Sequence, residues 1–172
     1  MKKIWFITLF PEVIEVALSF GVIAKYLESN SIEVKTINPS EFSEKGFKGV
    51  DASPYGGGPG MVMRADVLSK ALKEGVLSKY KHNESPLVVY PSPRGMKWNN
   101  VRAKNFFQNC NDKDLVFICG RYEGVDERFI KNYVNLEVSI GDFVMSGGEL
   151  PAIVILDSAL RFNDNALGNS MS

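Results

Sequence analysis

Two glycine-rich loops carry most of the side chains in this sequence that could take part in chemistry. The first, at residues 120–124, holds the carboxylate of Glu123 between two glycines, and the second, at residues 146–151, reads Ser-Gly-Gly-Glu-Leu-Pro. Because glycine has no Cβ, main-chain groups in such loops can come close to a ligand. A loop glutamate is more often an exposed charge, and glycines after strands often serve only tight turns. The residues alone therefore leave two interpretations open, a ligand-binding site or a pair of ordinary turns.

A third glycine-rich loop, at residues 55–61, has the composition of a phosphate-binding loop. The loop of nucleotide hydrolases continues with Gly-Lys-Ser or Gly-Lys-Thr, whereas this one continues with Gly-Met-Val. We therefore exclude nucleotide hydrolysis by a loop of that type. His82 is the only histidine and lies in a polar connector, so we do not expect it to act as a catalytic base.

The first two loops follow segments whose patterns predict strands. Residues 115–119 are continuously apolar, which is typical of a strand buried on both faces, and residues 134–140 alternate between apolar and polar. In open α/β sheets, ligands bind beyond the carboxyl ends of the strands. The sequence therefore predicts a ligand site where the two loops meet.

The rest of the chain alternates predicted strands with predicted helices. Further strands are expected at residues 4–9, 32–37 and 87–90, and helices at about 11–22, 65–80, 99–108 and 152–162. This alternation predicts an α/β fold with a mostly parallel sheet. Connection rules alone favour an unknotted, doubly wound sheet.

Length and composition fit one ordinary globular domain. The chain has 172 residues, with 45% hydrophobic and 23% charged. Twenty basic and twenty acidic residues cancel, so net charge gives no support for a nucleic-acid partner. The two cysteines fit a reduced, cytoplasmic protein better than a disulfide framework. We find no signal peptide and no membrane-spanning segment.

Five segments together resemble one enzyme family. In chain order they are TLFPE at 8–12, PYGGGPGM at 54–61, YPSPRG at 90–95, GRYEGVDER at 120–128 and SIGDFVMSGGELP at 139–151. This set is similar to the bacterial tRNA (guanine-N1)-methyltransferases, a knotted group of the SPOUT class. The resemblance implies a SPOUT methyltransferase domain over residues 1–162 with a C-terminal deep trefoil knot, which replaces the unknotted expectation. It also implies a homodimer, with no membrane attachment.

The implied reaction is methyl transfer from S-adenosylmethionine to N1 of the guanine 3′ to the anticodon, guanine-37 of tRNA. The resemblance assigns catalytic roles to Arg161 and Glu123, and no metal site; the sequence gives no support for a magnesium requirement. The loop at 55–60 is expected to bind substrate through Tyr55, Gly56, Gly57, Gly58, Pro59 and Gly60. The implied cofactor-binding residues are Tyr90, Pro91, Ser92, Pro93, Gly95, Gly120, Tyr122, Glu123, Gly124, Ile140, Gly141, Phe143, Met145, Gly147, Gly148, Leu150 and Pro151.

The resemblance also marks a departure at the end of the chain. Residues 163–172 match the start of an interdomain linker, and the family's general-base aspartate and C-terminal tRNA-binding domain would follow. Asp164 is the nearest carboxylate but does not match the base position. We therefore expect the chain to bind cofactor with little or no methylation activity. The alternatives are another SPOUT RNA methyltransferase and a cofactor-binding module without catalysis.

Overall fold

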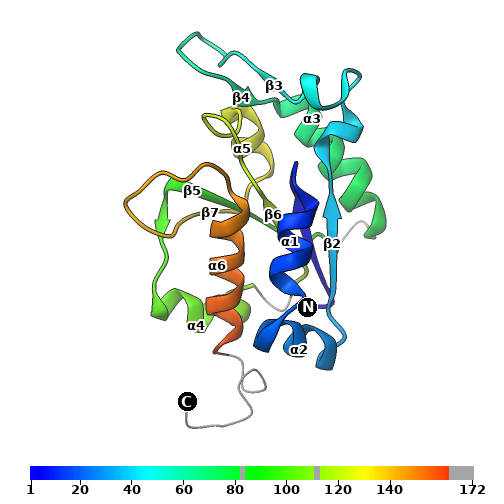
Figure 1. Cartoon of the computed structure of the whole chain (residues 1–172), viewed down its shortest axis with the longest axis vertical. Helices are drawn as coiled ribbons and strands as arrows, with labels where there is room; N and C mark the ends of the chain where they lie inside the picture. The colour runs from blue at the N-terminus through cyan, green and yellow to red at the C-terminus, as the bar shows by residue number, and fades with distance from the viewer. Residues whose placement is uncertain (82–83, 111–112, 163–172) are drawn as a thin grey trace.

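The main sheet has five strands, all parallel, in the order β2-β1-β6-β5-β7 (Figure 1). The computed structural model describes residues 1–81, 84–110 and 113–162; His82 and residues 163–172, including Asp164, lie outside this range. A short antiparallel pair, β3 and β4, stands apart from the sheet. The predicted α/β fold with a mostly parallel sheet is confirmed. The strands are β1 (Lys3–Ile7), β2 (Glu33–Ile37), β3 (Asp51–Ala52), β4 (Val62–Met63), β5 (Leu87–Lys97), β6 (Leu115–Ile118) and β7 (Leu136–Ser139).

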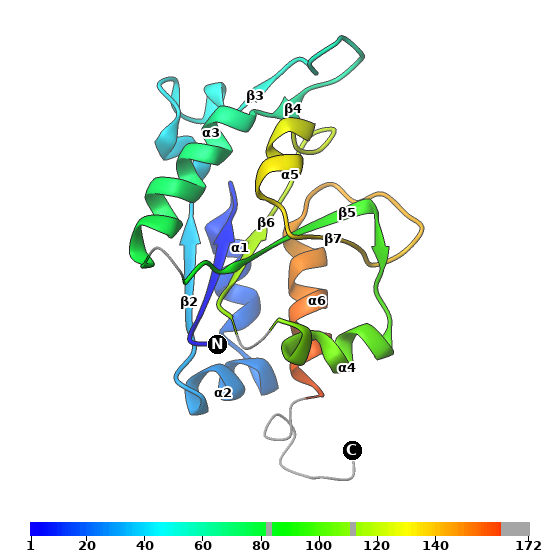
Figure 2. The same cartoon turned by 180° about the vertical axis from the view of Figure 1, so that it is seen from behind.

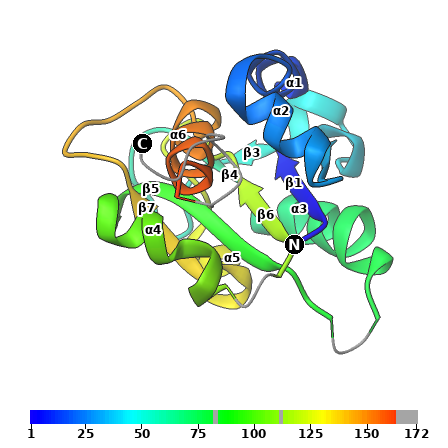
Figure 3. The same ribbon diagram turned by 90° about the horizontal axis from the view of Figure 1, so that it is seen from below.

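Helices cover both faces of the sheet (Figures 1 and 2). One face packs against α1 (Pro11–Leu18), α2 (Gly21–Ser29), α4 (Asn100–Asn109) and α6 (Glu149–Leu160). Viewed from below, α6 lies beside α1 and α2 on that face (Figure 3). The other face packs against α3 (Ala65–Lys70), its continuation η3 (Ala71–Val76), and α5 (Glu127–Tyr133). Short helical turns complete the chain at η1 (Pro39–Phe42), η2 (Gly46–Gly49) and η4 (Leu77–Lys79).

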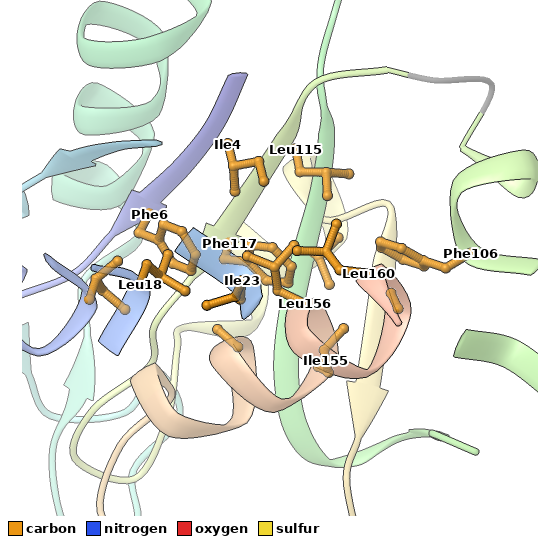
Figure 4. Packing of buried hydrophobic residues seen from close by; sticks show 14 of the residues in the cluster. Ile4, Phe6, Leu18, Ile23, Phe106, Leu115, Phe117, Ile155, Leu156 and Leu160 are labelled. Carbon is orange, nitrogen blue, oxygen red and sulfur yellow. The ribbon is translucent and has the colours of Figure 1, made fainter. Parts of the chain in front are cut away.

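The central strand β6 is buried on both faces, as its continuous apolar pattern predicts. All four of its residues have no exposed surface. Phe117 points into the core under α6, where its ring stacks on Phe6 of β1 with ring centroids 5.2 Å apart (Figure 4). Its neighbours Val116 and Ile118 point into the opposite core with Phe129 of α5. Burial on two faces places the end of β6 between both helix layers.

Several predicted boundaries differ from the structure for local reasons. The helix expected at 11–22 is two helices, because Gly21 takes a φ of +72° after the first one ends. The strand expected at 87–90 continues to Lys97, with a register shift against β7 between Pro91 and Met96. The last helix begins at Glu149 rather than after Pro151, since proline is tolerated in a first helical turn.

Asp114 ties the start of β1 to the start of β6. Its carboxylate accepts hydrogen bonds from the backbone N–H groups of Lys2 (2.7 Å) and Lys3 (2.9 Å) and from the hydroxyl of Tyr80 (2.8 Å). Burial disfavours the charged form, but these donors outweigh it and lower the pKa of Asp114 below its ordinary value. Because the pKa of this carboxyl group is lower in the folded state, its ionised form stabilises the fold at pH values above the unfolded-state pKa. This contribution disappears as the pH falls through the folded-state pKa.

Asp114→Asn is therefore expected to reduce the free energy of unfolding at pH 7 by about 1–2 kcal/mol, because charged hydrogen bonds are lost. The deficit should shrink as the pH falls below about 4, where the carboxyl group of the unfolded wild type takes up a proton. Urea unfolding at pH 7, 5 and 3 measures this. A deficit of the same size at all three pH values would contradict the charged role of Asp114.

Candidate functional site

Three loops converge on one cavity of about 550 Å³ at the carboxyl edge of the sheet. Its walls come from the middle of β5, from the segment between β6 and α5, and from the segment between β7 and α6. Figure 2 shows the loop between β7 and α6 arching past the bend in β5. The parallel strands β5, β6 and β7 end on the same side, which is why segments distant in sequence meet here.

The floor of the cavity is built around Tyr90 of β5, which is 5% exposed. Burial raises the pKa of its phenol, so the ring stays neutral at physiological pH. The backbone of Val125 partly opposes this rise in the pKa. A Cβ at Gly120 would lie 3.0 Å from the tyrosine ring, and one at Gly124 3.1 Å from its hydroxyl oxygen. These two glycines therefore let the loop after β6 lie directly on the tyrosine.

Gly147 and Gly148 form the opposite wall. The amide of Gly148 donates a hydrogen bond to the carbonyl of Gly120 (2.8 Å), which joins two of the three loops through their backbones. A Cβ on Gly148 would lie 2.7 Å from the Gly120 nitrogen and 2.8 Å from the Cα of Cys119. Only glycine fits this contact without displacing backbone.

The chain matches the family model described as tRNA (Guanine-1)-methyltransferase TrmD over residues 1–172. It belongs to the TrmD family. The chain is 40% identical over 170 residues to the tRNA (guanine-N(1)-)-methyltransferase of Francisella philomiragia, covering 99% of this chain and 64% of that protein. Its counterpart in Francisella tularensis subsp. holarctica is also 40% identical, with 65% of that protein covered. The chain therefore spans less than two thirds of the length of these relatives.

A solved structure agrees with this family assignment. The crystal structure of tRNA (m1G37) methyltransferase from Aquifex aeolicus superposes with a TM-score of 0.82 at 33% identity, covering 98% of this chain and 72% of that one. The SPOUT methyltransferase fold and the family implied by the five motifs are thereby confirmed. The trefoil knot stays a prediction from the resemblance.

Most of the cofactor-binding residues predicted for this TrmD family member line the cavity. Gly95 and Leu150 do not. Gly95 instead packs against β7, where a Cβ would lie 2.4 Å from the Val138 nitrogen, and Leu150 is 54% exposed on the surface of α6. The predicted cofactor-binding residues that line the cavity are Tyr90, Pro91, Ser92, Pro93, Gly120, Tyr122, Glu123, Gly124, Ile140, Gly141, Phe143, Met145, Gly147, Gly148 and Pro151.

The glycine loop predicted to bind substrate meets the cavity at its rim. Tyr55 lines the cavity, whereas residues 56–60 do not. The loop returns to the site through Gly60, whose φ is +81° and whose Cβ would lie 2.4 Å from Cγ of Glu123. The backbone amide of Glu123 also donates to the carbonyl of Met61 (2.9 Å). Glu123 is thus the cavity carboxylate that lies against the glycine loop.

Arg161 lies away from the cavity in its own chain. It follows the last residue of α6, is exposed, and does not line the cavity. The cavity instead meets the first turn of α6 at Gly148. Twelve helical residues separate the two ends, which corresponds to about 18 Å along the axis.

Asp126 and Arg128 were not among the predicted site residues, yet both line the cavity. Asp126 is the N-cap of α5 and accepts from the Arg128 amide (2.9 Å). The side-chain hydrogen bonds from Arg128 hold the pKa of Asp126 below its usual value. The guanidinium of Arg128 also lies over the Tyr55 ring, 4.8 Å from its centroid. This pair therefore connects α5 to the glycine loop at residues 55–61.

Arg94 forms a second charged group on the rim, although it was not among the predicted cofactor-binding residues. It pairs with Glu127 of α5 and with Glu137 of β7, the latter at 3.2 Å. A cation directly after the Pro-Ser-Pro segment was the available signal. Within the described ranges, no group of three or more His, Cys, Asp or Glu side chains is placed to hold a metal ion.

Proposed function

We propose that this chain carries the methyl-transfer site of a tRNA (guanine-N1)-methyltransferase, using S-adenosylmethionine to methylate N1 of guanine-37. The convergence of three glycine- and proline-rich loops on one cavity carries this proposal. Relatives named for this reaction, 40% identical over nearly the whole chain, support it. We also propose that the enzyme is cytoplasmic. Among the described helices, none is both long and apolar enough to cross a membrane.

The residues of the cavity fit the proposed cofactor. The volume of about 550 Å³ falls within the range of about 300–1,000 Å³ that small-molecule sites occupy. Pro91, Pro93 and Pro151 offer apolar walls for a flat base. Backbone groups beside Gly120 and Gly148 can reach the edge of such a base. The carboxylate of Glu123 lines the cavity, and its negative charge would suit a cationic sulfonium.

When bound, adenosylmethionine supplies an electrophilic methyl group. N1 of guanine carries a proton and becomes nucleophilic when it is lost, so the site needs a base and positive charge near O6. The guanine must also leave its stack to reach the cavity. We assign Glu123 to orient the reacting groups, because it faces both the cavity and the glycine loop.

We assign Arg161 to stabilise charge on the guanine, which requires a second copy of the chain. In its own chain it lies about 18 Å from the start of α6. A homodimer would bring the end of α6 to the cavity of the neighbouring copy. Support comes from exposed apolar side chains on the adjacent helices α1 and α6 and the residues beside them. These are Val13, Val16, Phe20, Leu150 and Val154.

Calorimetric titration with adenosylmethionine, followed by methyl transfer to tRNA, tests the proposal. We expect saturable binding with one cofactor per chain. Two tRNA transcripts that differ only in guanine or adenine at position 37 then serve as substrate and matched control. In keeping with the little or no methylation activity predicted from the sequence, we expect at most a low yield of label, recovered as 1-methylguanosine from the guanine transcript alone. No binding at millimolar cofactor would contradict the proposal.

The same assay separates the alternatives. Label in a ribose or in another base would favour a different SPOUT RNA methyltransferase. Cofactor binding with no label above that of the adenine transcript would favour a cofactor-binding module. Sedimentation of the chain with and without cofactor measures the proposed dimer.

A further inference from the structure

A buried charge network lies behind the cavity wall, outside the cavity itself. Glu149, the first residue of α6, is 1% exposed. Its Oε1 accepts a hydrogen bond from Thr8 Oγ1 (2.7 Å), a residue 141 positions earlier in the chain. Its Oε2 lies 2.9 Å from Nη2 of Arg121. Among the described residues Oε2 has no hydrogen-bond partner, so charge attraction joins it to Arg121.

Arg121 extends the network to the loop before α6. Its Nη1 donates to the carbonyl of Ser146 (3.4 Å), and its guanidinium lies 4.3 Å from the Phe10 ring centroid. The backbone amide of Phe10 in turn donates to Thr8 Oγ1 (3.0 Å). The end of β1, the loop after β6 and the start of α6 are therefore joined by one continuous set of contacts.

Side chains of this network lie directly against the backbone of Gly147. A Cβ added to Gly147 would lie 2.4 Å from Nε of Arg121 and 2.7 Å from Oε2 of Glu149. Ser146, Gly147 and Gly148 line the cavity, whereas Arg121 and Glu149 do not. The ion pair thus occupies the side of this backbone that faces away from the ligand space.

This ion pair is a weak source of net stability, because Glu149 and most of the Arg121 side chain lose their hydration. Removing one partner is strongly unfavourable, since the other charge stays buried without compensation. Such a pair can instead select one backbone arrangement. We infer that Arg121 and Glu149 are positioning residues that hold the backbone of residues 146–148 in the shape that binds the methyl donor. The identity of that ligand rests on the proposed function.

Glu149→Gln is the principal test, because glutamine keeps the shape and the acceptor for Thr8 but loses the charge. We expect adenosylmethionine to bind about tenfold more weakly or worse. We also expect the Gly148 amide, which donates to Gly120 in the wild type, to exchange its hydrogen about tenfold faster. Asp66→Asn is the control, since it breaks the exposed Arg64–Asp66 pair and should change neither quantity.

The double variant Arg121→Met/Glu149→Gln separates positioning from stability. It leaves no unpaired buried charge, so its melting temperature should recover relative to Glu149→Gln. Its affinity should stay at least tenfold weakened, because the link to the loop is still missing. Affinity that recovers together with the melting temperature would overturn the inference, as would Glu149→Gln binding within twofold of the wild type.

Hydrogen exchange keeps this test independent of the ligand. If the wild type binds no adenosylmethionine, the proposed function fails. The positioning role then stands if the Gly148 amide exchanges faster in Glu149→Gln than in Asp66→Asn, and falls if the two rates agree.

Discussion

Gly148→Ala is expected to weaken adenosylmethionine binding by at least about a hundredfold. The φ of Gly148 is −85°, so alanine meets no backbone strain there. The obstacle is contact, because the added Cβ would lie 2.7 Å from the Gly120 nitrogen and 2.8 Å from the Cα of Cys119. Both are backbone atoms of the loop after β6, so the two cavity walls must separate. Displacements of about 1 Å in a binding site can reduce function by about a hundredfold.

Gly75→Ala is the matched control for this experiment. Gly75 lies in η3, outside the cavity lining, and its added Cβ would meet side-chain atoms of Ile37 and Phe42 at 3.1–3.3 Å. We expect a small change in melting temperature and an affinity within twofold of the wild type. Calorimetric titration of both variants at a temperature where both are folded gives the comparison. A Gly148→Ala dissociation constant within threefold of the wild type would show that the two loops can separate without loss of the site.

The position of the site could be predicted from patterns in the sequence. The apolar run at 115–119 predicts a strand buried on both faces, and β6 has that burial. Parallel strands end on a common edge, so the loops after β6 and β7 had to meet. The prolines and glycines of those loops then supply walls that backbone can approach. These arguments use periodicity and local chemistry, which depend on neighbouring residues alone.

Contacts between distant segments could not be predicted in this way. The carboxylate of Glu149 meets Thr8 across 141 positions, and no local pattern indicates that partner. A glutamate directly before Leu-Pro in an apolar helix was the available signal that a charge is buried. The continuation of β5 past Pro91 also depends on its neighbour, because the register shift against β7 accommodates the proline segment. Arg161 shows the same limit, since the role proposed for it would require a second copy of the chain.

Phe117→Ala has the second largest expected effect, and it acts on stability. Phe117 has no exposed surface and stacks on Phe6 with an angle of 17° between the rings. It lies in the core cluster that also contains Ile155 and Leu156 of α6 (Figure 4). Removing a fully buried phenylalanine costs about 3–5 kcal/mol, because transfer free energy is lost and a cavity is left. Domains have only about 5–15 kcal/mol in total.

Urea unfolding followed by circular dichroism measures this loss, with Phe47→Ala as the matched control. Phe47 is 50% exposed, and its ring meets Phe10 edge-on at 6.4 Å. We expect the control to lose less than about 1 kcal/mol. The slope of free energy against urea should be similar in both variants, since the surface exposed on unfolding changes little. If Phe117→Ala lost no more free energy of unfolding than the control, β6 would not be the strand against which α6 packs. The packing that supports Gly147 and Gly148, directly before α6, would then have to come from elsewhere in the chain.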